Sequence, residues 1–314
     1  MWGFLVLRPG GHKAVTWAMD APRFTDEELP DGFEAVPVHW DEDDPQTVAL
    51  RLAGKGRVLS DCGLPGTRPA AARLRAAQYP LSGLETRRLA WIAEQVDVIC
   101  HDAADALEPG LTEREVAVDL AATFMRRGFA VDEMMVGFDD RLQRYRHPVA
   151  REAVLERAAL IHPTVNRWGL HGIATRMVHL GSPPTALVDS FATCSEVEAW
   201  SIAMSRPGVT FAEILRGQRE RYARRGHPDA WREHWQGGLT GFIMCDPAHV
   251  DRPQDAIPDG GIFNWFITLP GAKKEELTLA TPEGGRVLSL TGAWPIETID
   301  TDAGNVDVAR LLVR

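Results

Sequence analysis

The sequence lacks the features that mark membrane, secreted and nucleic-acid-binding proteins. No apolar run in its 314 residues reaches the ~18 residues of a transmembrane helix. Its apolar start is broken by Arg8 and Pro9 and has no basic segment before it, so no signal peptide is expected. Acidic side chains outnumber basic ones by 44 to 34, a net charge of −10 that argues against a nucleic-acid-binding surface. We expect a globular protein with no membrane and no nucleic-acid partner.

Several motifs of cofactor, metal and hydrolase sites are also missing. The four cysteines form no Cys-x-x-Cys pair, which argues against a zinc ribbon or a disulfide framework and favours reduced thiols in the cytoplasm. There is no Gly-x-Gly-x-x-Gly, no phosphate loop and no Gly-x-Ser-x-Gly. The sequence therefore indicates neither a nucleotide cofactor nor the usual serine-hydrolase nucleophile.

The first 60 residues have the pattern of a small α/β unit. Three strands and one helix are predicted there, over residues 4–7, 13–19, 57–60 and 47–53. The stretch 63–69 is rich in Gly and Pro and predicts turns. We therefore expect a small α/β N-terminal domain over residues 1–79 and a larger domain over residues 80–314.

The larger domain contains an internal repeat. Pro109-Gly110-Leu111-Thr112 precedes a predicted helix that ends before Gly128, and Pro207-Gly208-Val209-Thr210 precedes one that ends before Gly226. In each copy the first and last glycines are 18 residues apart, and the copies are offset by 98 residues. A long predicted helix comes before each copy, over residues 84–107 and about 190–205. The threonines suit N-caps and the closing glycines suit C-caps, so a duplicated pair of helices is predicted.

Strand-like segments follow each pair of helices. They cover residues 130–131, 134–136, 239–245, 262–269, 277–279 and 287–290. Helix pairs followed by strands, twice, indicate an α+β domain made of duplicated ααβ units. We expect a curved antiparallel sheet with the helices outside and a pocket at the pseudo-twofold axis.

The order and spacing of several short segments resemble the creatinase/aminopeptidase P superfamily. These segments are Pro109–Glu113, Gly169–Leu170, Ala174–Arg176, Arg206–Thr210, His234–Gly241, Gly271–Glu276 and Ala293–Pro295. The resemblance covers about residues 84–314. It implies the pita-bread fold for the larger domain, and a homodimer in which the N-terminal unit of one chain covers the cleft of the other.

The resemblance also implies a metal site, from which this chain departs. Metallopeptidases of the superfamily hold two divalent ions with two Asp, one His and two Glu, since hard ions need several carboxylate oxygens. The corresponding positions here are His162, Ile173, Gly238, the acid-free stretch 263–267, and Glu275. Only Glu275 keeps the ligand chemistry, so we expect no metal and no cofactor. The alternative is a single ion held by His162, His171, His234 and Glu275.

Creatinase is a metal-free precedent within the superfamily and uses a histidine as acid and base. The resemblance places that histidine in the loop 141–148, where an ungapped count reaches Tyr145 and a shift of two residues reaches His147. We favour His147 as the catalytic group, because an imidazole titrates near neutral pH and a phenol does not. His234 and Glu275 are then expected to orient His147 or to hold substrate.

The remaining candidate residues are expected to bind substrate. Arginine suits carboxylates, so an anionic substrate held by Arg146 and Arg176 is expected. The other expected contacts are Tyr145, His162, His171 and Trp265. An ordinary structural role stays open for each candidate, as part of a solvated loop, a surface ion pair or the packed core.

These observations favour a metal-independent enzyme that acts on a small polar, anionic substrate. The expected reaction is C–N hydrolysis, or a related elimination or cyclisation, by general acid/base catalysis. Two alternatives stay open. One is a metal-dependent Xaa-Pro-type aminopeptidase with displaced ligands, and the other is a non-catalytic binding module on the same fold.

Overall fold

The chain folds into two units in the computed structural model, which describes residues 3–246 and 248–314. The first unit ends at Ala77, and the second runs from Gln78 to Arg314. The sequence places this boundary after residue 79. None of the helices in the described ranges has the length and apolar character that a bilayer span requires.

The small unit is built on a mixed sheet with strand order β1-β2-β3, antiparallel between β1 and β2 and parallel between β2 and β3. The bounds of these strands are Gly3–Val6, His12–Trp17 and Phe33–Val38. Helix α2 (Pro45–Ala53) begins at Asp44, whose carboxylate accepts the backbone N–H groups of Gln46 and Thr47. The shorter elements are α1 (Ala21–Arg23), η1 (Phe24–Glu28), β4 (Leu59–Ser60), β5 (Arg68–Pro69) and α3 (Ala71–Ala77).

Two matching pairs of helices organise the larger unit. The first pair is α4 (Gly83–Asp105) with α5 (Glu113–Arg126), and the second is α7 (Thr185–Met204) with α8 (Phe211–Arg224). Both α5 and α8 have 14 residues and start with the same capping box, formed by Thr112 with Glu115 and by Thr210 with Glu213. Gly128 and Gly226 follow these helices at φ 81° and 87°, where a side chain would be strained. The duplicated helix pair predicted from the repeat is confirmed.

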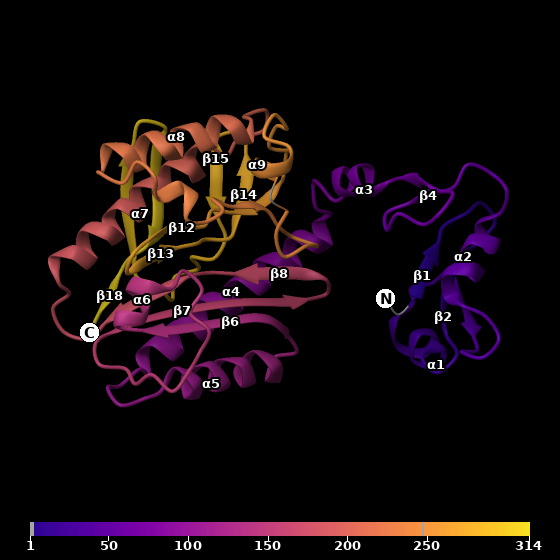
Figure 1. Cartoon of the computed structure of the whole chain (residues 1–314), viewed down its shortest axis with the longest axis horizontal. Coiled ribbons are helices and arrows are strands. Elements are labelled where there is room, and N and C mark those ends of the chain that lie inside the picture. Colours follow the sequence, from indigo (N-terminus) through magenta and orange to yellow (C-terminus); the bar gives the residue numbers. More distant parts are fainter. Residues whose placement is uncertain (1–2, 247) are drawn as a thin grey trace. The chain divides into compact units, whose positions relative to one another are not determined.

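The strands of the larger unit lie inside these helices (Figure 1). One sheet has the order β18-β9-β7-β6, with β8 on β7, and another has the order β10-β11-β14-β15. Two hairpins, β12-β13 and β16-β17, complete the arrangement. Helix α4 packs on β7 and β8 and α5 on β6, whereas α7 packs on both hairpins and on β15. This mixed α+β arrangement, with helices outside sheets that are mostly antiparallel, is the pita-bread fold expected from the sequence.

The bounds of the remaining elements are β6 (Ala130–Phe138), α6 (Asp140–Arg144), β7 (Ala158–Arg167), β8 (Leu170–Ile173), β9 (Arg176–His179), η2 (Ala230–Arg232), β10 (Gly238–Leu239), α9 (Ala248–Asp251), β11 (Ile262–Asn264), β12 (Ile267–Leu269), β13 (Ala272–Lys274), β14 (Thr278–Thr281), β15 (Gly284–Val287), β16 (Ile296–Thr301), β17 (Gly304–Ala309) and β18 (Leu312–Val313).

Several predicted strands are wrong in extent. The strand expected over residues 57–60 is reduced to β4, and the one expected over residues 287–290 overlaps β15 only at residue 287. Two further differences have a local cause. The strand expected over residues 239–245 is reduced to β10, because the Thr240 hydroxyl donates to the carbonyl groups of Ile243 and Met244 and the chain folds back. The strand expected over residues 262–269 is two strands in different sheets. The break falls at residues 265–266, where the Trp265 indole turns inward to Ser205.

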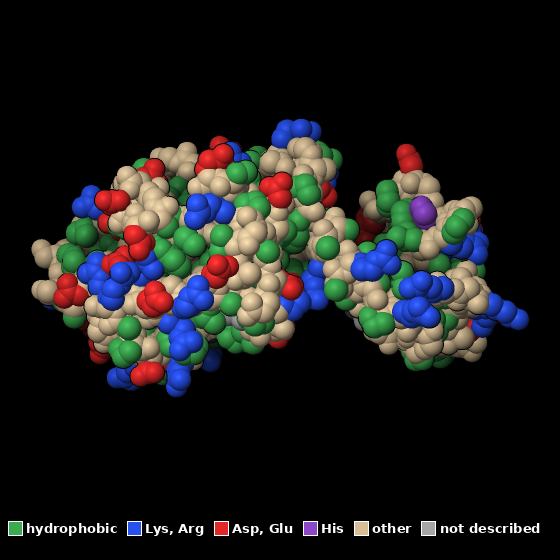
Figure 2. All heavy atoms as spheres, turned by 90° about the horizontal axis from the view of Figure 1, so that it is seen from above, with side chains coloured by type: hydrophobic (Ala, Val, Ile, Leu, Met, Phe, Trp, Pro, Cys, Tyr) green, Lys and Arg blue, Asp and Glu red, His purple; other side chains and the backbone are tan. Residues whose placement is uncertain are grey.

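Apolar side chains in the larger unit form two buried clusters. One includes Ile92, Val96 and Phe124 of the first helix pair, and the other includes Val197 and Ile214 of the second pair. Each copy of the repeat therefore contributes to a core of its own. On the face of the larger unit seen in Figure 2, Lys/Arg and Asp/Glu side chains are interspersed.

Candidate functional site

Residues from both halves of the larger unit line one cavity of about 220 Å³. The first half contributes Glu133, Met135, His147, His162, Thr164 and Ile173. The second half contributes His234, Trp235, Met244, Cys245, Asn264, Phe266, Lys273 and Glu275. The predicted catalytic residues His147, His234 and Glu275 thus meet at the same cavity, together with His162.

His147 and His234 form a hydrogen-bonded pair. Their Nε2 atoms are 2.8 Å apart. Nδ1 of His234 lies against the carbonyl oxygen of Trp235, so neutral His234 carries its proton on Nδ1 and accepts with Nε2. His147 must then donate from Nε2. This assignment of the protons leaves Nδ1 of His147 as an unprotonated base.

Their surroundings favour the neutral form of both imidazoles. Partial burial lowers the pKa of His147, and the positive charge of Lys273 lowers it further. Burial and then Lys273 lower the pKa of His234 to about 3. A neutral imidazole with an open nitrogen can take a proton, so the pair is suited to general base chemistry.

A second polar group in the cavity is almost wholly buried. His162, Asn264, Lys273 and Glu275 are each at most 3% exposed. Oε1 of Glu275 accepts a hydrogen bond from the Asn264 amide, and Oε2 lies 3.6 Å from both His162 Nδ1 and Lys273 Nζ. Burial raises the pKa of Glu275 to about 7, against the opposing effect of Lys273. Burial also holds the pKa of His162 well below its usual value.

The alternation of β-strand side chains explains why Lys273 and Glu275 reach the cavity. Successive residues point to opposite sides, so Lys274 and Glu276 leave the cavity while Lys273 and Glu275 line it. The sequence does not single out Lys273 or Asn264 as site residues. The run Lys-Lys-Glu-Glu resembles a solvated surface, and only its period of two, together with the preceding Gly271 turn, points to two different environments.

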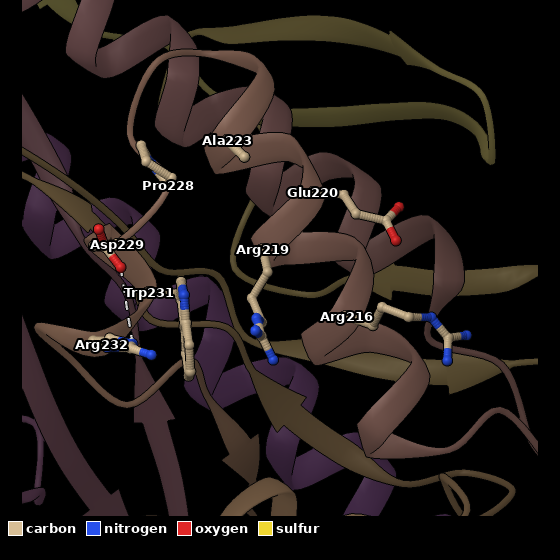
Figure 3. Close-up of a pocket in the computed structure, with 8 residues that line it drawn as sticks. All are labelled: Arg216, Arg219, Glu220, Ala223, Pro228, Asp229, Trp231 and Arg232. Carbon is tan, nitrogen blue, oxygen red and sulfur yellow. Dashed lines mark ion pairs between the residues drawn. The ribbon is translucent and has the colours of Figure 1, made fainter.

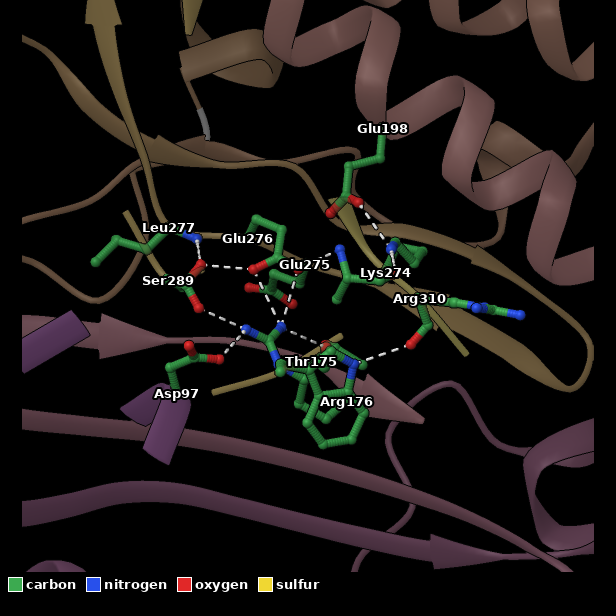
Figure 4. Close-up of polar contacts among 12 residues, drawn as sticks. Asp97, Thr175, Arg176, Glu198, Lys274, Glu275, Glu276, Leu277, Ser289 and Arg310 are labelled. Carbon is green, nitrogen blue, oxygen red and sulfur yellow. Dashed lines mark hydrogen bonds and ion pairs between the residues drawn. The ribbon is translucent and has the colours of Figure 1, made fainter. Parts of the chain in front are cut away.

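Arg176 belongs to a buried ion network rather than to the cavity (Figure 4). Its guanidinium donates to Glu276 at 2.9 Å and to the Ser289 carbonyl at 2.6 Å, and lies 3.3 Å from Asp97. Arg176 is 1% exposed. Arg176 does not line the cavity and its guanidinium has these internal partners, so nothing in its surroundings supports the predicted substrate-binding role.

The arginine loop between α6 and β7 holds two further predicted contacts, neither of which lines the cavity. Tyr145 is exposed, and the guanidinium of Arg141 stacks on its ring at 5.0 Å. Arg146 pairs with Glu233, and its positive charge contributes to the lowered pKa of His234. Arg146 therefore lies near the histidine pair, and its role in anion binding stays a prediction.

His171 and Trp265 have internal partners. Nδ1 of His171 is 2.8 Å from the carbonyl oxygen of Gly241, and its Nε2 is 3.4 Å from Asp132. Trp265 is 1% exposed, and its indole N–H donates to Ser205 at 3.0 Å. Neither residue lines the cavity, so their positions give no support to the predicted contact with substrate.

The cavity residues do not fit two divalent ions. His162, Ile173, Asn264 and Glu275 occupy the cavity wall at or near the positions where the resemblance implies ligands. A side chain at Gly238 would collide with the Asp246 backbone, since a Cβ there meets its carbonyl carbon at 3.0 Å. The remaining carboxylate already faces the Lys273 ammonium. Among the described residues no group of three or more His, Cys, Asp or Glu side chains is placed to hold a metal.

A second cavity, of about 430 Å³, lies between α8 and η2 and is open to solvent (Figure 3). Arg219 lies over the Trp231 ring at 4.3 Å, and Arg232 lies 3.9 Å from Asp229. None of the predicted site residues lines it. It offers no histidine or cysteine for acid/base or nucleophilic chemistry, so the smaller cavity is the candidate site.

This chain is similar to one known protein family and to several solved structures. The model of metallopeptidase family M24 matches residues 89–257. No significant match was found among curated protein sequences.

Among solved structures, dipeptidase PepE from Mycobacterium ulcerans is 20% identical with a TM-score of 0.78, over 99% of this chain and 86% of that one. The prolidase from Pyrococcus horikoshii OT3 is 18% identical with a TM-score of 0.77, over 91% and 87%. The X-Pro aminopeptidase from Thermotoga maritima MSB8 is 16% identical with a TM-score of 0.77, over 99% and 90%. At these identities the likeness shows a shared fold.

Proposed function

Because the chain belongs to metallopeptidase family M24, within the creatinase/aminopeptidase P superfamily, we propose that it is a hydrolase that cleaves a C–N bond without a metal ion. The observation that carries the proposal is the pair formed by His147 and His234, 2.8 Å apart at a cavity whose residues do not fit two metal ions. A neutral imidazole can take a proton from water and so activate it, which is the task of the metal ions in a metallopeptidase.

The proposed reaction uses one water molecule. Nδ1 of His147 takes a proton as the water oxygen attacks the carbon of the C–N bond, and a C–O bond forms. The same proton then passes to the leaving nitrogen as the C–N bond breaks, which returns His147 to its neutral form. His234 accepts the Nε2 proton of His147 in a hydrogen bond throughout, and so fixes the ring orientation.

The cavity also indicates what kind of substrate is cleaved. Its volume of about 220 Å³ is below the ~300–1,000 Å³ of sites for drug-sized ligands, which supports a small substrate. Two buried acceptor atoms, Oδ1 of Asn264 and Oε2 of Glu275, have no hydrogen-bond partner among the described residues. They suit N–H groups of the substrate, as an amide or amine would supply. The names dipeptidase, prolidase and X-Pro aminopeptidase of the solved relatives support a small substrate with a scissile bond to nitrogen.

Other functions have less support. A metal-dependent Xaa-Pro-type aminopeptidase needs displaced ligands, and the described residues offer no such cluster. A non-catalytic binding module does not need a base with a lowered pKa in a cavity, whereas His147 has one. Elimination or cyclisation would use the same histidine pair and differs from hydrolysis only in the fate of the proton and the absence of water uptake.

The experiment is a hydrolysis screen with and without chelator. Purified protein is incubated with Xaa-Pro dipeptides, N-acyl amino acids and ureido acids, with 1,10-phenanthroline or with added Mn²⁺. We expect turnover of a small amide-type substrate that is insensitive to both additions and falls at least about 100-fold in His147→Gln. His39→Gln, in the small unit, is the matched control. Activity that needs Mn²⁺ would overturn metal independence, and no turnover with any member of the screen would favour the binding module.

The expected homodimer and cytoplasmic location are proposals that rest on the resemblance and on the cysteine pattern. Sedimentation equilibrium of the full chain tests the first. A mass of twice 34.7 kDa is expected.

A further inference from the structure

Lysine is scarce in this chain, yet two lysines are buried side by side. Of the 34 Lys+Arg residues, only Lys13, Lys55, Lys273 and Lys274 are lysines. Lys273 is 3% exposed and Lys274 is 1% exposed. A buried ammonium group is costly unless its charge is compensated. The contacts of each lysine therefore indicate its role.

Lys274 is fully provided with partners. Its Nζ donates to the carbonyl oxygen of Ala309, lies 3.5 Å from Oε2 of Glu198, and is 4.9 Å from the centroid of the Phe191 ring. These three contacts compensate the charge inside the protein (Figure 4 shows the contact with Glu198). Lys274 is accordingly a structural residue.

Lys273 has fewer internal contacts than Lys274. Its ion pair with Oε2 of Glu275 is 3.6 Å long, beyond the range of a direct hydrogen bond. It is the one lysine or arginine among the described residues that line the cavity. Its three N–H donors therefore lie at a water-accessible cavity of about 220 Å³ with a single long internal contact.

The same cavity also holds two acceptor atoms that make no hydrogen bond with the described residues. Oδ1 of Asn264 and Oε2 of Glu275 are buried without a hydrogen bond in the described structure. A ligand that satisfied all three groups would present an anionic oxygen to Lys273 and an N–H group to the two acceptors. Such a ligand relieves the cost of burying these polar atoms, which gives it a specific place in the cavity.

We propose that Lys273 is the anion-binding residue of this cavity, and that its ligand is a small molecule carrying a carboxylate beside an N–H donor. The ammonium takes the role that the sequence predicts for Arg146 and Arg176. Neither arginine lines the cavity, and their guanidinium groups pair with Glu233 and Glu276. This inference rests on the proposed function in treating the cavity as the substrate site. It is tested by binding rather than by turnover, so either can fail alone.

The small number of lysines makes the test direct. The full chain is labelled with ¹³C at the lysine ε-carbons, which gives signals from four residues that Lys→Arg variants assign. It is titrated with acetate, with the neutral isostere acetamide, and with N-acetylglycine, all at constant ionic strength. Lys274, the sequence neighbour on the other side of the strand, is the internal control.

We expect acetate to move the Lys273 signal in a saturable way while the Lys274 signal stays in place. Acetamide should move neither signal. N-acetylglycine should saturate at a lower concentration than acetate, because it adds the N–H donor. A Lys273 signal that does not respond, or four signals that move alike, would overturn the proposal.

A variant gives a second measurement. Acetate-dependent thermal stabilisation should weaken at least about tenfold in apparent Kd in Lys273→Met and stay unchanged in Lys55→Met. If Lys273→Met does not fold, the titration of the wild-type chain decides. Carboxylate binding without any turnover would support this inference and contradict the proposed function. Turnover by a chain whose Lys273 ignores carboxylates would do the reverse.

Discussion

Replacing Arg176 by Met tests whether this residue belongs to the fold or to the substrate. Met has a similar length and no charge, so the change removes the ion pairs with Glu276 and Asp97 while it keeps most of the volume. Removing one partner of a buried ion pair costs about 3–5 kcal/mol, because the other charge stays buried. Here both carboxylates keep other donors: Glu276 accepts from the Ser289 hydroxyl at 2.6 Å, and Asp97 accepts from the Thr291 N–H at 2.8 Å. We therefore expect a loss at the lower end, about 3 kcal/mol.

The assay is urea unfolding of the full chain, followed by circular dichroism and by tryptophan fluorescence so that the two units can be told apart. Arg216→Met, on the exposed surface of α8, is the matched control and should cost less than about 0.5 kcal/mol. Arg176→Lys, which keeps the charge and loses the planar fork, should fall between the two. If Arg176→Met were as stable as the control and yet lost N-acetylglycine binding, Arg176 would be a substrate ligand and the structural reasoning would be wrong.

The remaining predictions concern the histidine pair and the repeat. Since the pKa of His147 is lowered and the neutral form is the active base, kcat/KM should rise with pH through a value below 6.5 and be flat at neutral pH. A pH profile of the substrate found in the screen measures this, and a rise centred above pH 7 would exclude His147 as the base. Thr112→Ala and Thr210→Ala should each lower the free energy of unfolding by about 1 kcal/mol, because each removes the same capping box. Urea unfolding compares them, and a large loss in one with none in the other would contradict the equivalence of the two helices.

Much of the fold can be predicted from local chemistry. The pattern Pro-Gly-x-Thr predicts the start of α5 and α8, and both begin at that threonine because its hydroxyl caps the third backbone N–H of the helix. The strands are harder to place. The apolar run 262–269 looks continuous, yet Trp265 turns inward to Ser205 and splits it between two sheets. This depends on tertiary packing, which the periodicity of one segment does not contain.

Only part of the candidate site can be predicted from local sequence chemistry. His147 and His234 are 87 residues apart, so their 2.8 Å contact could be anticipated only through a resemblance to known enzymes. Arginine is the expected anion ligand because its planar guanidinium suits carboxylates, but this chemistry does not show which guanidinium is already engaged within the protein. Lys273 cannot be singled out in the same way, because a charged run in a short segment suggests a solvated surface, whereas all three residues of this strand are buried.

The charges of the buried cavity explain why these differences from the metallopeptidases occur together. Four carboxylates and two divalent cations balance to zero in the ligand set that the superfamily implies. Here Ile173 and His162 stand at the two Asp positions and Asn264 lies in the stretch that would supply a Glu, which leaves Glu275 as the one buried carboxylate of that set. A single ammonium, that of Lys273, lies 3.6 Å from Glu275 and compensates its charge where that carboxyl is ionised. Because a low-dielectric cavity penalises any uncompensated charge, loss of the carboxylates without Lys273, or gain of Lys273 without their loss, would each be unfavourable. The loss of the carboxylates and the presence of Lys273 are therefore physically linked, and they place an ammonium group at the same cavity as the histidine pair.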